Sequence, residues 1–190
     1  AAEAGMSAVP SDNPIVQQLQ LVLSGYGYNF YDDRNRARSD DLLVRQRASG
    51  LLATACDSLK VLEVDFRSLY IPTATRDNPY PPPDVLAKLK ALSRMRDKLG
   101  DLETQIRSMA VPTQDRVWWR FRQELPLLEM LISHDYGLIR DAQNLEEFLL
   151  RISAEDWKSR DIPSETAPAV AALQQTIRER IDFLQVQAPI

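Results

Sequence analysis

The chain has 190 residues, of which 44% are apolar and 26% are charged, and its net charge is -4. This length is enough to bury a hydrophobic core in one large domain without disulfides. The mild acidic balance argues against a general nucleic-acid binder, which needs a basic face to neutralise phosphates. No apolar run reaches the roughly 18 residues that a membrane-spanning helix requires.

The N-terminal residues 1–11 are small and polar, and we expect an extended segment there, followed by a single helical domain over residues 12–190. Cys56 is the only cysteine, so an internal disulfide is impossible. No signal peptide is visible. Two interpretations stay open: Met6 is the native start, or a targeting peptide has been removed before Ala1.

A first helix is predicted from Asp12, which can cap it, to about Ser24, with Pro14 in its first turn. Its buried face is marked by Ile15, Leu19 and Leu23. The following GYGYNFYDD, in which aromatic residues surround two glycines, predicts a turn with aromatic packing.

The strongest helical pattern runs from about Ser39, or alternatively from Asp32, to Tyr70, and its apolar residues recur at spacings of three and four. This seam consists of Val44, Ala48, Leu51, Ala55, Leu59, Leu62, Phe66 and Leu69.

A second long helix is predicted from Asp84, which can cap it, to Ala110. Its seam consists of Val85, Leu89, Leu92, Met95, Leu99, Leu102, Ile106 and Met109. Between the two long helices lies the sequence RDNPYPPPD, residues 76–84, whose prolines limit the freedom of the chain. The sequence therefore predicts an antiparallel hairpin with a rigid proline tip.

A further helix is predicted after its cap, Thr113, with a kink at Pro126. Its seam consists of Trp118, Phe121, Leu125, Leu128 and Ile132. Continuing that seam would turn Asp135 inward, and the pattern restarts at Leu138. This phase shift beside Gly137 predicts a break at SHDYG.

A last helix is predicted from a cap at Thr166, with Pro168 in its first turn. Its seam consists of Val170, Leu173, Ile177, Ile181 and Leu184. The sequence shows no strand alternation, and the fold class it predicts is all-α: an antiparallel up-and-down helical bundle of five or six helices, two of them long.

Catalytic and metal-binding motifs are missing from the sequence. His134 is the only histidine, so a di-iron site with two Glu-x-x-His motifs is excluded, and we expect a surface or satisfied histidine. One thiol excludes thiolate zinc and iron–sulfur sites. No phosphate-binding glycine loop occurs. We therefore expect no enzyme activity, no metal and no organic cofactor.

The charged clusters favour solvated surfaces. The acidic pairs Asp32-Asp33, Asp40-Asp41 and Glu146-Glu147 are expected on exposed helix faces or in first turns. The stretch DRNRARSDDLLVRQR carries five arginines and three aspartates, and Asp32 precedes it, so the charges nearly cancel. A self-paired helix surface is the preferred interpretation of this stretch.

Two groups of residues are candidate partner-binding sites. The tip offers rigid apolar area through Tyr80, Pro81, Pro82 and Pro83. In VWWRFRQ the seam places Trp118 in the core and leaves Trp119 unassigned. We expect Trp119 to pack on a neighbouring helix; otherwise it is an interface anchor together with Arg120 and Arg122.

One family resemblance can be stated. A helix bearing VRQRASGLL, a proline loop, a helix reading LAKLKALSRMRDKLGDLE and a helix opened by VPTQDRVWW follow one another. This order resembles the PsbQ-like extrinsic proteins of photosystem II, which are lumenal four-helix bundles. The similarity covers about residues 38–128, rests on helix order and proline breaks, and departs from the pattern after Ile132. It implies a non-catalytic subunit peripheral to a membrane complex in the thylakoid lumen.

The sequence thus favours a non-catalytic subunit that binds other protein subunits. The alternative is a cytosolic or periplasmic sensor or regulatory protein that binds a ligand in a bundle-core pocket, with Arg45, Arg47 or tyrosines as contacts. Without the PsbQ-like interpretation, the cytoplasm is the expected location.

Overall fold

The computed structural model describes residues 14–15, 18–19, 23 and 37–186, with the side chains of residues 37–39 left out. The six helices within these ranges are α2 (Ala37–Tyr70), α3 (Pro83–Arg107), α4 (Asp115–Gln123), α5 (Leu125–Leu150), α6 (Ala154–Ser159) and α7 (Ile162–Val186). The predicted turn over residues 25–33 and the extended residues 1–11 lie outside the described residues.

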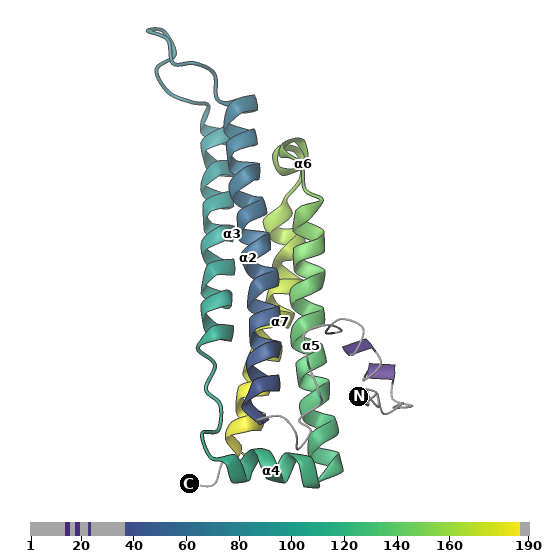
Figure 1. The fold of residues 1–190 in the computed structure, drawn as a ribbon. Helices are drawn as coiled ribbons and strands as arrows, with labels where there is room; N and C mark the ends of the chain where they lie inside the picture. The colour runs from purple at the N-terminus through teal and green to yellow at the C-terminus, as the bar shows by residue number, and fades with distance from the viewer. Residues whose placement is uncertain (1–13, 16–17, 20–22, 24–36, 187–190) are drawn as a thin grey trace, which may run out of the picture.

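The long helices α2, α3, α5 and α7 run alternately up and down and form an antiparallel bundle (Figure 1). Helix α2 packs against α3 and α5, and α5 packs against α7. The short α4 crosses one end of the bundle, and α6 lies towards the other end (Figure 1). The all-α fold class is therefore confirmed.

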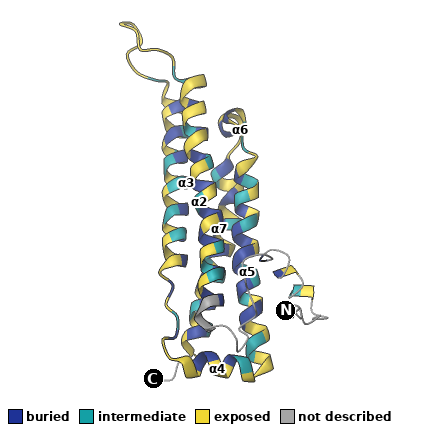
Figure 2. Ribbon diagram, in the orientation of Figure 1, coloured by how far each residue is buried: buried dark blue, intermediate teal, exposed yellow. Residues whose placement is uncertain are grey.

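The predicted seams form the core, in which buried positions face the bundle axis (Figure 2). Val44, Leu59 and Phe66 of α2 are fully buried. Burying each such side chain contributes on the order of 2 kcal/mol. Leu19 and Leu23, from the predicted first helix, are also buried, at 1% and 2% exposed. Most of that helix lies outside the described residues.

Two seam assignments are wrong. Leu69 is 66% exposed and Leu125 is 68% exposed. Leu69 lies in the last turn of α2, near the projecting tip. Leu125 begins a new helix, because Gln123 ends α4 and Glu124 separates the two helices with extended backbone. Pro126 therefore lies in the first turn of α5 instead of kinking one continuous helix, which suits a residue without an N–H.

The predicted break at SHDYG is wrong. Helix α5 passes through residues 133–137 without interruption, and Asp135 is fully buried. The seam continues through Asp135 because its inward carboxylate is paired with Arg180 of α7. A β-carbon added to Gly137 would meet Thr176 Cγ2 of α7 at 3.5 Å, an ordinary contact, so this glycine does not require a break.

Three predicted helix caps are also wrong. Pro82 is the N-cap of α3, so Asp84 lies in the first turn, and Gln114 rather than Thr113 is the N-cap of α4. Helix α7 begins at Ile162, and Thr166 lies inside it. The Thr166 hydroxyl donates to the Ile162 carbonyl at 2.8 Å, one turn back, instead of capping.

Candidate interaction surfaces

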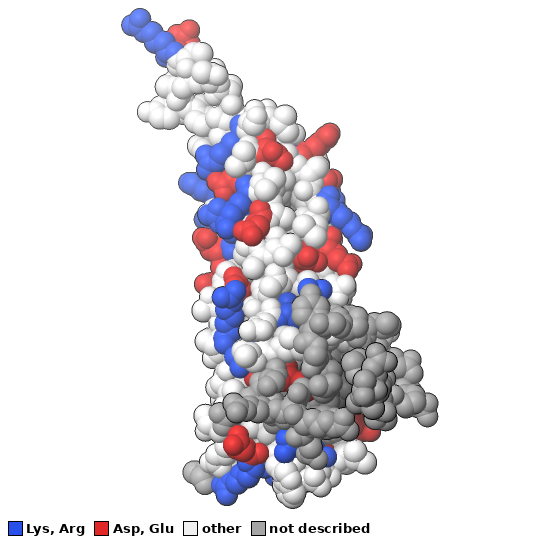
Figure 3. All heavy atoms as spheres, viewed as in Figure 1, with Lys and Arg blue, Asp and Glu red and all other residues white. Residues whose placement is uncertain are grey.

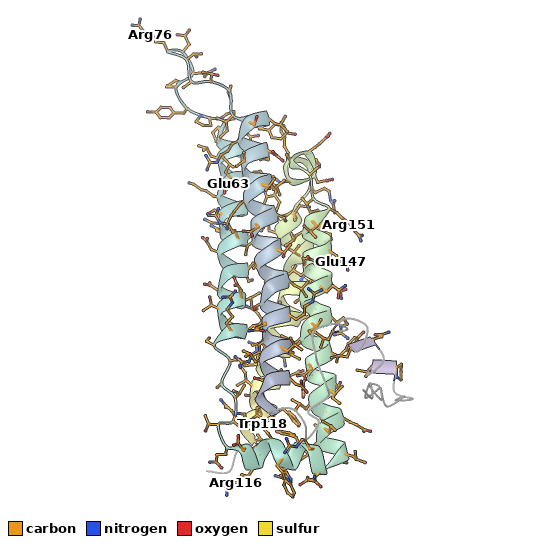
Figure 4. The ribbon with its side chains drawn as sticks, in the orientation of Figure 1. Glu63, Arg76, Arg116, Trp118, Glu147 and Arg151 are labelled. Carbon is orange, nitrogen blue, oxygen red and sulfur yellow. The ribbon has the colours of Figure 1, made fainter. Side chains whose placement is uncertain are left out.

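The loop between α2 and α3 projects beyond the other helices (Figure 1). Its turn is organised by Thr75, whose N–H donates to the Asn78 carbonyl and whose hydroxyl accepts from the Asn78 N–H, both at 3.1 Å. Arg76 lies at the outer end of this loop (Figure 4). Tyr80 is 82% exposed, and Pro82 has φ -55° and ψ 140°, the polyproline II region. Pro81 is half-buried, and Pro83 starts α3.

Helix α4 lies at the opposite end, and its two neighbouring tryptophans differ in their exposure to solvent. Trp118 is fully buried, and its indole N–H donates to the Pro112 carbonyl at 2.9 Å. Trp119 points away from the core and is 55% exposed. Its expected packing on a neighbouring helix is therefore wrong.

The cations near Trp119 differ in their contacts. Arg120 forms an ion pair with Glu124, one helical turn on, at 2.6 Å. That pair raises the pKa of the Arg120 guanidinium. Arg122 is half-buried. The structure therefore leaves Trp119 as the exposed aromatic side chain of α4, beside the exposed Leu125, and neutralises Arg120 within the chain.

The two predicted partner-binding groups are not brought together. The tip is at one end of the bundle, and α4 is at the other (Figure 1). The 34 residues of α2 alone correspond to a length of about 51 Å. Tyr80 and Trp119 therefore belong to two separate surfaces.

The charged stretch at the start of α2 is only partly a self-paired surface. Arg45 forms the predicted one-turn pair with Asp41 at 2.8 Å, and it also donates to the Arg107 carbonyl of α3 at 2.9 Å. Asp40 lies in the first turn of α2, which agrees with one of the two expected placements of this acidic pair. Asp40 and Asp41 are both 1% exposed, so the other expected placement, on a solvated face, is wrong. The other acidic pair that is described agrees with the prediction: Glu147 is exposed and Glu146 half-exposed.

The reason for the burial of Asp41 is an ionic centre that sequence reasoning missed. Arg180 of α7 is fully buried and donates to Asp135 of α5 and Asp41 of α2, each at 2.8 Å. Its Nη1 lies 3.1 Å from the Met109 sulfur. Arg45 pairs with the other oxygen of Asp41, so this carboxylate contacts two arginines.

A signal for this centre exists in the sequence. Arg180 follows Leu173 and Ile177 at spacings of four and three, so it occupies a core position of α7. Asp41 precedes Val44 by three residues, and Asp135 lies between core positions of α5. Opposite charges at core positions of three helices predict a buried ion pair.

His134 and Cys56 are both partly or fully withdrawn from solvent. The His134 ring lies 5.0 Å from the Phe183 ring, and burial, with the positive Arg180 nearby, lowers the pKa of the imidazole. Burial also raises the pKa of the Cys56 thiol, whose sulfur lies 3.7 Å from the Arg96 carbonyl. Among the residues that the structure describes, neither side chain has the nucleophile–base contact that covalent catalysis uses.

Within residues 37–186 and the few described positions before them, no group of three or more His, Cys, Asp or Glu side chains could hold a metal ion. In the same part of the chain, no helix combines the length and the apolar character needed to cross a membrane. Comparison with family models, curated proteins and solved structures gave no match to this chain.

Proposed function

We propose that this protein is a non-catalytic subunit that binds other protein subunits through the two ends of its helical bundle. The observation that carries the proposal is the exposure of Tyr80, at 82%, and Trp119, at 55%, on surfaces at opposite ends of the bundle. Both residues are large aromatic side chains of the kind that dominate binding energy at interfaces.

The proline-bearing tip adds a second reason. The fixed φ angles of Pro81, Pro82 and Pro83 limit the conformational entropy that this segment loses on binding. The tip also stands clear of the neighbouring helices, so a partner can approach it from several sides (Figure 1). A bundle with one anchor at each end suits a subunit that bridges two parts of a larger assembly.

The PsbQ-like resemblance gives this proposal a narrower form. In that form the partners are photosystem II subunits, and the protein is a lumenal extrinsic subunit. The support is the helix order in the sequence together with the four long helices of the bundle. Co-purification with photosystem II subunits from the native source tests this form, and co-purification with unrelated partners replaces it.

The decisive experiment is affinity capture from the native source with the normal protein and with Tyr80→Ala, Trp119→Ala and the double variant. Loss of an identified partner from either single variant supports the corresponding surface. Leu86→Ala, which shortens a 38% exposed side chain on α3, is the control and is expected to retain every partner. Retention of all partners by the double variant contradicts the proposal, as does turnover of a small molecule by a protein that captures nothing.

A further inference from the structure

A third apolar surface lies near the tip end of the bundle, on the side formed by the last turns of α2 and α5 and by the start of α6. It is a groove of about 670 Å³ between α2 and the last turn of α5, closed on one side by the start of α6. Three of its lining side chains are large, apolar and exposed: Val61 at 62%, Leu69 at 66% and Leu150 at 51%. Exposed apolar groups gathered in a concave surface mark binding sites more often than isolated ones do.

The charged side chains of the groove have one sign. Asp65 of α2 and Glu155 of α6 are the ionisable residues of its lining. Among the described residues, neither carboxylate accepts a hydrogen bond or joins an ion pair. On the face of the molecule seen in Figure 3, a mostly uncharged strip runs along the bundle between two columns of charged side chains. The groove therefore offers an apolar floor with two unpaired negative charges.

A stripe on α5 indicates what kind of element covers this side of the bundle. Ile139, Gln143 and Leu150 lie on one stripe, because their spacings of four and seven return to the same helix face. At the level of Ile139, Leu19, which is helical and 1% exposed, lines a small pocket together with Ile139, and the Tyr136 hydroxyl donates to the Gln18 side chain. At the level of Leu150, half of the side chain is exposed.

We propose that the groove binds an amphipathic helix of a partner protein, with an apolar stripe flanked by lysine or arginine. The stripe would cover Val61, Leu69 and Leu150, as the helical Leu19 lies beside the Ile139 level of the same face, and the cations would pair with Asp65 and Glu155. The lining on α2 runs from Ser58 to Leu69, a distance of about 16 Å, which matches three turns of a helix. Recognition of a helix by an apolar groove is a common mode of binding.

This inference goes beyond the proposed function, because it uses neither Tyr80 nor Trp119. The probe is a synthetic peptide of about fourteen residues, long enough for three to four helical turns, with leucines on one face and lysines flanking them. A second peptide carries glutamates in place of the lysines. Binding is measured by fluorescence anisotropy on the full chain.

The variants include a closely matched control. Val61→Ser with Leu69→Ser is expected to raise the Kd of the lysine peptide by about tenfold or more, as loss of apolar anchors does. Val64 is 65% exposed on the same helix but does not line the groove. Val64→Ser is therefore expected to change the Kd by less than about twofold. Circular dichroism and thermal unfolding check that each variant folds.

The charges are tested separately. Asp65→Asn with Glu155→Gln is expected to weaken binding of the lysine peptide and to reduce its dependence on salt. Asp101→Asn, which removes an exposed carboxylate of α3, is expected to change neither. The glutamate peptide is expected to bind more weakly than the lysine peptide.

Three results would overturn the proposal. One is an equal Kd for the normal protein and the Val61/Leu69 variant. Another is equal or tighter binding of the glutamate peptide. The third is self-association in sedimentation velocity that Leu69→Ser abolishes and Val64→Ser retains, because the occupant would then be a second copy of this chain. None of these results bears on Tyr80 or Trp119, so the two proposals fail independently.

Discussion

Arg180 donates two hydrogen bonds to one oxygen of Asp135, from Nε at 3.0 Å and from Nη2 at 2.8 Å, and both side chains are fully buried. The two residues are 45 positions apart in the chain and join α5 to α7. Because Asp41 shares the same guanidinium, the contact also reaches α2.

Removing one partner of this centre is predicted to be strongly destabilising. Arg180→Met leaves Asp135 buried without its cation and is expected to lower the free energy of unfolding by about 3–5 kcal/mol. Denaturant unfolding measures this loss. The control is Arg178→Met, two residues away at an exposed position, where a change within about 0.5 kcal/mol is expected.

The Arg180–Asp135 pair is predicted to contribute less to the free energy of unfolding than the loss from either single substitution suggests. In Arg180→Met with Asp135→Leu, no unpaired charge remains at Asp135, and Asp41 keeps Arg45. The double variant is therefore expected to be more stable than the sum of the two single losses predicts. Strict additivity in the double-mutant cycle would contradict this coupling.

The long seams of α2 and α3 could be predicted because their apolar spacing is local information. The path of α5 does not follow from its own residues, because the cost of burying Asp135 is offset by Arg180 in another helix; it follows only when the core position of Arg180 in α7 is considered as well. The burial of Asp41 has the same explanation, because Arg180 of α7 also pairs with this carboxylate. Among the candidate surfaces, the tip could be predicted from its prolines. The exposure of Trp119 could not, because it depends on the direction in which α4 crosses the bundle. The groove at Leu69 could not be predicted either, because it depends on where α5 ends.

Gly137 distinguishes the continuous helix from the break that the sequence predicts. In a continuous helix, Gly137→Ala is expected to raise the free energy of unfolding by roughly 0.5–1 kcal/mol, because alanine loses less backbone entropy. The added β-carbon meets Thr176 at an ordinary distance of 3.5 Å. Gly50→Ala, inside α2 with open space around it, is the reference for the same gain. A loss of stability at Gly137 alone would indicate a non-helical backbone there.

His134 is predicted to make stability depend on pH. Because its folded pKa lies below the ordinary value of 6.5, the unfolded chain binds the proton more readily. The stability that neutral His134 contributes to the folded state is complete above a pH of about 6.5. It is lost as the pH falls through the folded pKa. Thermal unfolding between about pH 7 and 5 is expected to show a smaller decline in Tm for His134→Gln than for the normal protein. Parallel curves would assign the decline to other groups.

Cys56 is predicted to react slowly with thiol reagents in the folded protein. It is 8% exposed, and its raised pKa reduces the fraction of reactive thiolate at neutral pH. The labelling rate of the native chain is expected to be well below that of the chain in denaturant, with the difference greatest near neutral pH. Equal rates in the two states would show that the α2–α3 contact opens readily around Cys56.

The ionic centre also sets an order for folding during synthesis. Helices α2 and α3 can close their hairpin early, because their contacts are near in sequence and short loops close at low entropic cost. Asp41 and Asp135 cannot be buried together until α7 has been made and Arg180 has arrived. A nascent chain that ends before α7 therefore exposes the two carboxylates, Asp41 and Asp135, that are buried in the finished bundle. Completion of the core must wait for the last of the four long helices.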